Sequence, residues 1–168
     1  MKYSSIWAAT VILRKDVKTE LRSRHGVSIL ILFGVTATTV ISFVLGIPDI
    51  DEAVAAALLW VILFFLSVAG LGYSFIREEE QMTMDGLLMA VPVEGVYLGK
   101  VLFNLLLLTV AQGVVVPVFM LLFNLQMGLW ARFLAAMFFG SCGLSVACTL
   151  VAALISRTQA KGPLLAVL

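Results

Sequence analysis

Residues Arg77 to Lys100 read REEEQMTMDGLLMAVPVEGVYLGK, and an apolar run long enough to cross a bilayer lies on each side of them. Half of the ten carboxylates in the chain fall inside this segment, namely Glu78, Glu79, Glu80, Asp85 and Glu94. The segment is also longer than the roughly 2–8 residues that usually join two packed helices. A long acidic connection between two apolar runs is typical of an element that docks a soluble partner.

Composition assigns the chain to the integral membrane proteins. Hydrophobic residues make up 62% of the chain and charged residues 12%, whereas soluble domains average about 25% charged residues. The mean hydropathy is +1.11. The net charge of +1 provides no basic field for a nucleic acid partner. Cys142 and Cys148 are about 9 Å apart along a helix, so they predict neither a disulfide nor a metal site.

Four apolar runs reach the length of about 20 residues that a helix needs to cross a bilayer. They cover residues 27–45, 53–76, 101–123 and 130–155. A fifth run opens at Pro163 and continues only to Leu168, so we expect the chain to end inside a helix and to be incomplete at its C-terminus. The pattern predicts one all-α transmembrane domain over residues 1–168, with a cytoplasmic connection at 77–100.

Residues 4–24 precede the first span and have the pattern of an interfacial helix. The apolar residues that share one face at helical spacing are Ile6, Ala9, Leu13, Val17 and Leu21. The residues on the opposite face are Lys15, Lys18, Thr19 and Arg22. We expect this helix to lie in the membrane plane with its basic face toward anionic lipid.

Lysine and arginine predict the orientation, because they are enriched on the cytoplasmic side of membrane proteins. Ten of the eleven basic residues fall before the first span, in the 77–100 connection or after the fourth span. Only Arg132 falls on the other side. The distribution predicts that the N-terminus and the 77–100 connection are both cytoplasmic.

Polar side chains within the spans are few. Asn104 and Gln112 lie in the third span, where interhelical hydrogen bonding is the favoured interpretation and contact with a polar group of a substrate is the alternative. The fourth span contains two pairs of small residues that predict close helix packing, Ala136/Gly140 and Gly143/Ala147.

The sequence carries no motif for chemistry of its own. It has no phosphate loop, no nucleophile elbow and no cluster of metal ligands, so we expect no catalytic residue and no metal site. Any work driven by ATP must then use a separate polypeptide.

The order of several segments resembles the ABC-2 type permeases. In that group the second span is followed by an acidic run, a short helix ending in Leu-Leu, a proline, and a Gly-Lys pair that opens the third span. The corresponding residues here are Glu78, Glu79, Glu80, Asp85, Leu87, Leu88, Pro92, Gly99 and Lys100. Four segments together look like the CcmB family of haem exporter proteins: LRKDVKTELRSR (13–24), LWVILFFLSVAGLGYSF (59–75), GLLMAVPVEGVYLGK (86–100) and SRTQAKGPLLAVL (156–168).

The resemblance implies a permease subunit with six spans in the complete family fold, located in the bacterial inner membrane. It implies a separate CcmA-like ATPase subunit that binds ATP, and further membrane proteins that are CcmC-, CcmD- and CcmE-like. ATP hydrolysis would drive export of haem or release of the haem-loaded chaperone in c-type cytochrome biogenesis. Two permease protomers are compatible with this architecture.

The resemblance also implies roles for residues of the 77–100 segment. We expect Glu78, Glu79 and Glu80 to face basic residues of the ATPase, and Leu87 and Leu88 to fill its apolar groove. Asp85 and Pro92 complete the expected ATPase-coupling residues. Two alternatives remain open: a generic ABC-2 exporter of lipid, polysaccharide or drug, and a non-transporting scaffold for membrane assembly.

Overall fold

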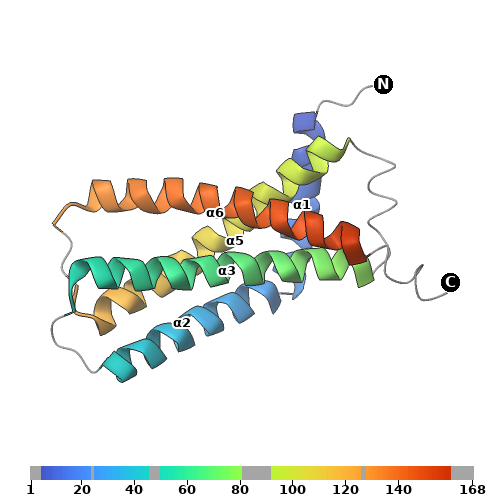
Figure 1. Ribbon diagram of the computed structural model, residues 1–168. Helices are drawn as coiled ribbons and strands as arrows, with labels where there is room; N and C mark the ends of the chain where they lie inside the picture. The colour runs from blue at the N-terminus through green and yellow to red at the C-terminus, as the bar shows by residue number, and fades with distance from the viewer. Residues whose placement is uncertain (1–4, 24, 46–49, 81–91, 126–127, 160–168) are drawn as a thin grey trace.

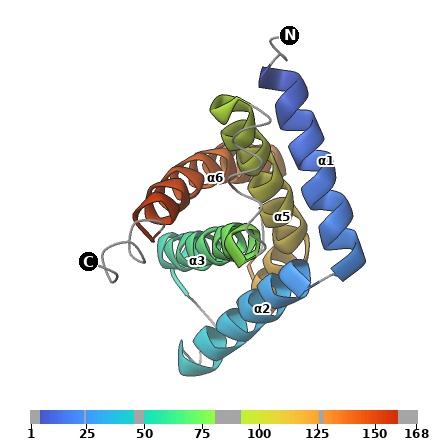
Figure 2. The ribbon, with the colours of Figure 1, turned by 90° about the vertical axis from the view of Figure 1, so that its right-hand side faces the viewer.

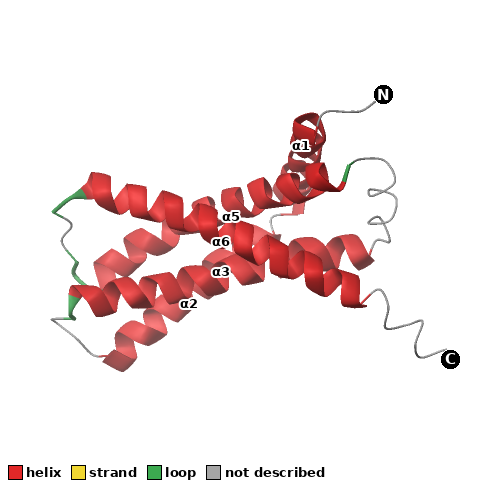
Figure 3. Ribbon diagram, turned by 45° about the horizontal axis from the view of Figure 1, so that its top comes forward, coloured by secondary structure: helices red, strands yellow, loops and turns green. Residues whose placement is uncertain are grey.

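The computed structural model describes residues 5–23, 25–45, 50–80, 92–125 and 128–159, with the backbone alone described at 71–80 and 155–159. The helices are α1 (Ser5–Ser23), α2 (His25–Leu45), α3 (Glu52–Glu80), α5 (Val93–Leu122) and α6 (Trp130–Gln159). These described ranges contain no strand (Figure 3). Within them, four helices are long and apolar enough to cross a membrane, which confirms the all-α membrane class.

Two of the helices extend beyond the apolar runs that predict them. α3 continues to Glu80 and α5 begins at Val93, although the apolar runs end at Ile76 and begin at Val101. Hydropathy ends a run at the first charged residue, but helical hydrogen bonding does not depend on side-chain polarity. Both arms of the 77–100 segment are therefore helical next to the spans, and residues 81–91 lie outside the described residues.

The four long helices lie alongside one another, and α1 lies across one end of them (Figure 1). At that end α2 and α5 begin and α3 and α6 end, whereas α2 ends and α3 begins at the opposite end. Figure 2 shows α1 beside α5, which contacts each of the other described helices. The N-terminal helix and the two arms of the 77–100 segment thus share one end of the bundle.

The bundle has an apolar core but, unlike a soluble protein, also an apolar exterior. Large apolar side chains are exposed on the outside, including Phe43, which is 82% exposed, and Phe139, which is 73% exposed. Several polar side chains are buried between the helices, namely Thr38, Ser67, Asn104, Ser141, Ser145 and Thr149. An apolar exterior around polar contacts is the pattern expected of helices that are solvated by lipid chains.

The helices approach closely where one of them has a glycine. A Cβ atom added at Gly34 of α2 would lie 2.5 Å from Val115 Cγ2 of α5, and one added at Gly140 of α6 would overlap the Trp60 ring of α3. The predicted packing role of small residues in α6 therefore holds at Gly140. It is wrong within this bundle for Ala136, Gly143 and Ala147, which are exposed because they lie on other sides of α6.

Candidate functional site at the crossing of α1 and α5

Some of the expected ATPase-coupling residues lie within the residues that the structure describes, and others lie outside them. Glu78, Glu79 and Glu80 form the last residues of α3, where only the backbone is described. Asp85, Leu87 and Leu88 lie outside the described residues. Pro92 is described and immediately precedes α5.

Pro92 starts α5. Its backbone is extended, with φ −60° and ψ 141°, and its carbonyl accepts hydrogen bonds from the N–H groups of Gly95 at 2.9 Å and Val96 at 3.2 Å. Proline lacks the N–H that a first helical turn would leave unbonded, and its ring already fixes a helix-compatible φ. Glu94 then places a carboxylate in the first turn, next to the positive end of the helix dipole. The local sequence thus determines where the helix after the acidic segment begins.

The first two turns of α5, Val93–Lys100, pack against α1 and are called the return arm below. A Cβ atom added at Gly95 would lie 2.5 Å from Ala8 Cβ, and one added at Gly99 would lie 2.8 Å from Ile12 Cγ2. Ala8 and Ile12 are both buried. Glycines four residues apart lie on one helix face, so they let the α1 backbone approach the return arm closely.

The face of α1 that packs on the bundle differs from the apolar face that the sequence assigns to the membrane. Ala9 is buried, but Ile6 is 72% exposed and Leu21 is 70% exposed. The face that packs on the bundle is Ala8, Ala9, Ile12, Asp16 and Glu20, roughly a quarter-turn from the apolar face that periodicity predicts. Small size at Ala8 and Ala9 and charge pairing at Asp16 determine which face of α1 packs on the bundle, and the placement of its apolar face in the membrane stays a prediction.

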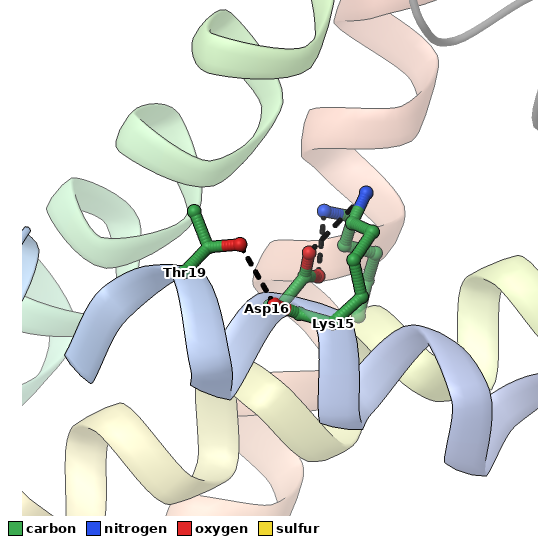
Figure 4. A network of polar contacts seen from close by, with 4 residues as sticks. Lys15, Asp16 and Thr19 are labelled. Atoms are coloured by element: carbon green, nitrogen blue, oxygen red, sulfur yellow. Dashed lines mark hydrogen bonds and ion pairs between the residues drawn. The ribbon is translucent and has the colours of Figure 1, made fainter. Parts of the chain in front are cut away.

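A buried ion pair lies in this contact. Lys100 Nζ donates to Asp16 Oδ2 at 2.9 Å, and the two side chains are only 1% and 8% exposed. Lys15, which is 42% exposed, approaches the other oxygen of Asp16 at 3.5 Å from the solvent side. Figure 4 shows Lys15, Asp16 and Thr19 together on α1, where Thr19 Oγ1 donates to the carbonyl of Lys15 at 2.8 Å. The pair joins residues that are 84 positions apart in the chain.

The second buried carboxylate of α1 caps the next helix. Glu20 Oε1 accepts a hydrogen bond of 2.8 Å from the backbone N–H of Val27, in the first turn of α2. A Cβ atom added at Gly26 would lie 3.0 Å from both carboxylate oxygens of Glu20. The first N–H groups of a helix lack partners within it and carry partial positive charge, so a carboxylate there stabilises the helix start.

The two amides of the third span form hydrogen bonds between helices, as the sequence favours. Asn104 Nδ2 donates to Ser67 Oγ of α3 at 3.1 Å, and Gln112 Nε2 donates to Ser141 Oγ of α6 at 2.6 Å. Ser145 of α6 donates to the carbonyl of Val101 at 2.7 Å. These bonds connect α5 to α3 and α6 along its length, and contact of Asn104 or Gln112 with a substrate stays a prediction.

Sequence reasoning missed Asp16, Glu20 and the burial of Lys100. A signal was available, because Asp16 and Glu20 are carboxylates four residues apart on an otherwise basic helix. Gly95 and Gly99 have the same spacing immediately before Lys100. Such matched spacing on two segments indicates a helix crossing that contains opposite charges.

The comparison with protein families identifies the chain. A family model described as CcmB protein matches residues 7–168, which include both helices of this crossing. The chain belongs to the CcmB family. This CcmB-family chain is 28% identical over 164 residues to Heme exporter protein B of Bradyrhizobium diazoefficiens, covering 96% of this chain and 73% of that relative. No solved structure matches it.

The family assignment confirms the resemblance drawn from the four sequence segments. Together with the four helices that can span a membrane, it makes this chain a multi-pass membrane protein of the permease type. The α1–α5 crossing then becomes a feature of a permease, at the end of the bundle where both arms of the acidic segment lie.

Proposed function

We propose that this chain is the membrane subunit of an ABC exporter complex in c-type cytochrome biogenesis. In this role it couples ATP hydrolysis by a separate ATPase subunit to export of haem, or to release of a haem-loaded chaperone. The observation that carries the proposal is the CcmB family match over residues 7–168, and the name of the relative at 28% identity supports haem as the exported molecule.

The ATPase would dock on the 77–100 segment at the cytoplasmic side of the bacterial inner membrane. The helices α3 and α5 support this docking, because both continue into the 77–100 segment. Movement of the segment between them would therefore move two membrane-crossing helices. In this proposal Glu78, Glu79, Glu80 and Asp85 supply charge to the contact, and the apolar Leu87 and Leu88 fill a groove in the partner.

The mechanism is rigid-body coupling between two conformations. Nucleotide binding closes the ATPase dimer, the docked segment moves with it, and α3 and α5 change their positions in the bilayer. ATP shifts the permease only to the extent that the ATPase binds one permease conformation more tightly. CcmC-, CcmD- and CcmE-like membrane proteins and a second permease protomer would complete the assembly around the haem substrate.

The proposal is tested on the complex of this chain with its ATPase subunit, purified from membranes. The variants are L87A/L88A and E78Q/E79Q/E80Q, and the matched control is D51N/E52Q at the opposite end of the bundle. Loss of both leucines is expected to abolish co-purification, because truncating a buried leucine costs about 2–5 kcal/mol. The glutamate variant is expected to weaken it, because exposed ion pairs contribute roughly 0.2–1 kcal/mol each.

Two results would reject the proposal. One is a wild-type chain that neither binds the ATPase nor changes its rate of ATP hydrolysis. The other is a leucine variant whose co-purification and ATP hydrolysis equal those of the D51N/E52Q control. Transport of haem is then tested by ATP-dependent release of the haem-loaded chaperone from the complete assembly.

A further inference from the structure

The return arm and α1 are held together as one unit by two kinds of contact. Gly95 and Gly99 bring the two backbones into direct contact, so neither helix can rotate without a steric clash. The Asp16–Lys100 pair adds a contact that depends on direction, because both charges are buried and separating them would break a hydrogen bond of 2.9 Å between them. Together the two contacts fix the register between the arm and α1.

The other end of α1 is held on α2 by Glu20. The carboxylate accepts the N–H of Val27, and the absence of a side chain at Gly26 gives it the space to do so. Between the end of α1 at Ser23 and the start of α2 at His25 there is one residue. A displacement of α1 therefore acts on the first turn of α2 through the chain itself and through this hydrogen bond.

These contacts form a continuous route from the return arm to α2. We infer that α1 is a second coupling element, which carries movement of the ATPase-docking segment to α2, and that Asp16, Lys100 and Glu20 are its positioning residues. The inference rests on the proposed function and adds a helix that neither adjoins the docking segment in sequence nor spans the bilayer. In this arrangement three spans respond to nucleotide: α3 and α5 directly, and α2 through α1.

The ion pair has a specific task in this route. An apolar contact of the same size permits sliding between helices, whereas a hydrogen-bonded charge pair is satisfied in one register only. The pair therefore converts movement of the return arm into movement of α1 without slippage. Lys15 is not part of this connection, because it contacts Asp16 from the exposed side of the same helix.

The first experiment measures stimulation of the ATPase by this chain in the purified complex, in a C142A/C148A background. The variant D16L/K100M replaces the ion pair by apolar groups, which leaves neither charge of the pair buried without the other and allows folding. We expect normal amounts of complex, but a loss of about fivefold or more in the stimulation of ATP hydrolysis. This magnitude lies at the lower end of the usual range of coupling between two sites. The matched control K15Q removes the exposed cation beside Asp16 and is expected to keep wild-type stimulation.

A covalent replacement for the ion pair distinguishes coupling from stability. A Cβ atom at Gly99 would lie 2.9 Å from Ile12 Cβ, so cysteines at both positions can form a disulfide after a small outward shift. The variant I12C/G99C added to D16L/K100M is expected to recover stimulation when oxidised and to lose it again when reduced. A role in stability alone predicts no such dependence on oxidation.

The movement of α2 is measured directly with spin labels at F43C of α2 and L134C of α6, two exposed positions near the ends of their helices. In the wild-type complex we expect nucleotide to shift the distance between these labels. The shift is expected to become smaller in E20A, where only the chain connection between α1 and α2 remains, and to keep its size in E20Q, because glutamine keeps the oxygen that accepts the Val27 N–H.

The outcomes separate this inference from the proposed function. A wild-type chain that fails to stimulate the ATPase overturns the proposed function, and the inference with it. Wild-type stimulation together with full stimulation in D16L/K100M, or with a shift of α2 in E20A as large as that in E20Q, overturns the inference alone. Failure of the oxidised disulfide to restore stimulation also overturns it.

Discussion

Substitution of Gly95 by alanine should undock α1 from the bundle. The added Cβ atom would lie 2.5 Å from Ala8 Cβ and 3.1 Å from the carbonyl oxygen of Ser5. Carbon atoms pack best at about 3.5–4.0 Å, so the two helices must separate by roughly 1 Å. Overpacking of this kind costs about 1–3 kcal/mol.

The cost can be read as a change in the population of undocked α1. Ala9 is buried in the same contact, so an A9C reporter in the C142A/C148A background reacts with a water-soluble maleimide only when α1 opens. Because 1.4 kcal/mol is a tenfold change in an equilibrium, the reaction rate should rise by about 5- to 140-fold in G95A. The rate is measured in native membranes by mass spectrometry.

Two further variants make this result specific. G113A adds the same methyl group to the same helix, where nothing lies within 4 Å, and should leave the rate unchanged. A8G/G95A moves the methyl group from α1 to α5 and should recover most of the lost docking. Equal rates in G95A and G113A would refute the packing argument, and a failure of A8G to compensate would place the clash elsewhere.

Three other predictions concern stability in detergent, measured by SDS titration in mixed micelles with circular dichroism. D16L alone removes the carboxylate at 2.9 Å from the buried Lys100 and should lower the free energy of unfolding by about 3–5 kcal/mol. D16L/K100M should recover most of this loss, and a larger loss in the double variant would contradict the prediction. Q112L should cost about 0.6–1.7 kcal/mol through the lost bond to α6, and no change would show that the bond is not stabilising. G140A should cost about 1–3 kcal/mol because its Cβ would meet the Trp60 ring, while G143A, with nothing within 4 Å, serves as the matched control and should cost nothing.

The spans could be predicted from the sequence because a bilayer imposes a length and a polarity on any helix that crosses it. The runs 27–45 and 130–155 agree with α2 and α6 to within a few residues. The start of α5 could not be predicted in this way, because Lys100 ends the apolar run. Its buried charge is paired with Asp16 at 2.9 Å, on a segment distant in sequence.

Part of the candidate site could be predicted, because that part depends on residues that are neighbours in the sequence. The acidic segment and its flanking proline are local features, and Pro92 lies at the N-cap of α5 with an extended backbone. The packing face of α1 was not predictable from its periodicity. That face contains two carboxylates, which a count of apolar residues assigns to solvent, and their burial depends on a lysine of α5 and an N–H group of α2.

The sequence by itself determined the class of protein, the positions of four spans, the acidic segment between the second and third of them, and the CcmB family. These depend on composition, run length and the order of local motifs, all of which are properties of neighbouring residues. Only the tertiary structure decided that α1 crosses α5 at Gly95 and Gly99, that Asp16 pairs with Lys100, and that Glu20 caps α2. The physical reason is that a buried charge or a glycine contact is favourable only when a specific partner, distant in the chain, occupies the adjoining space.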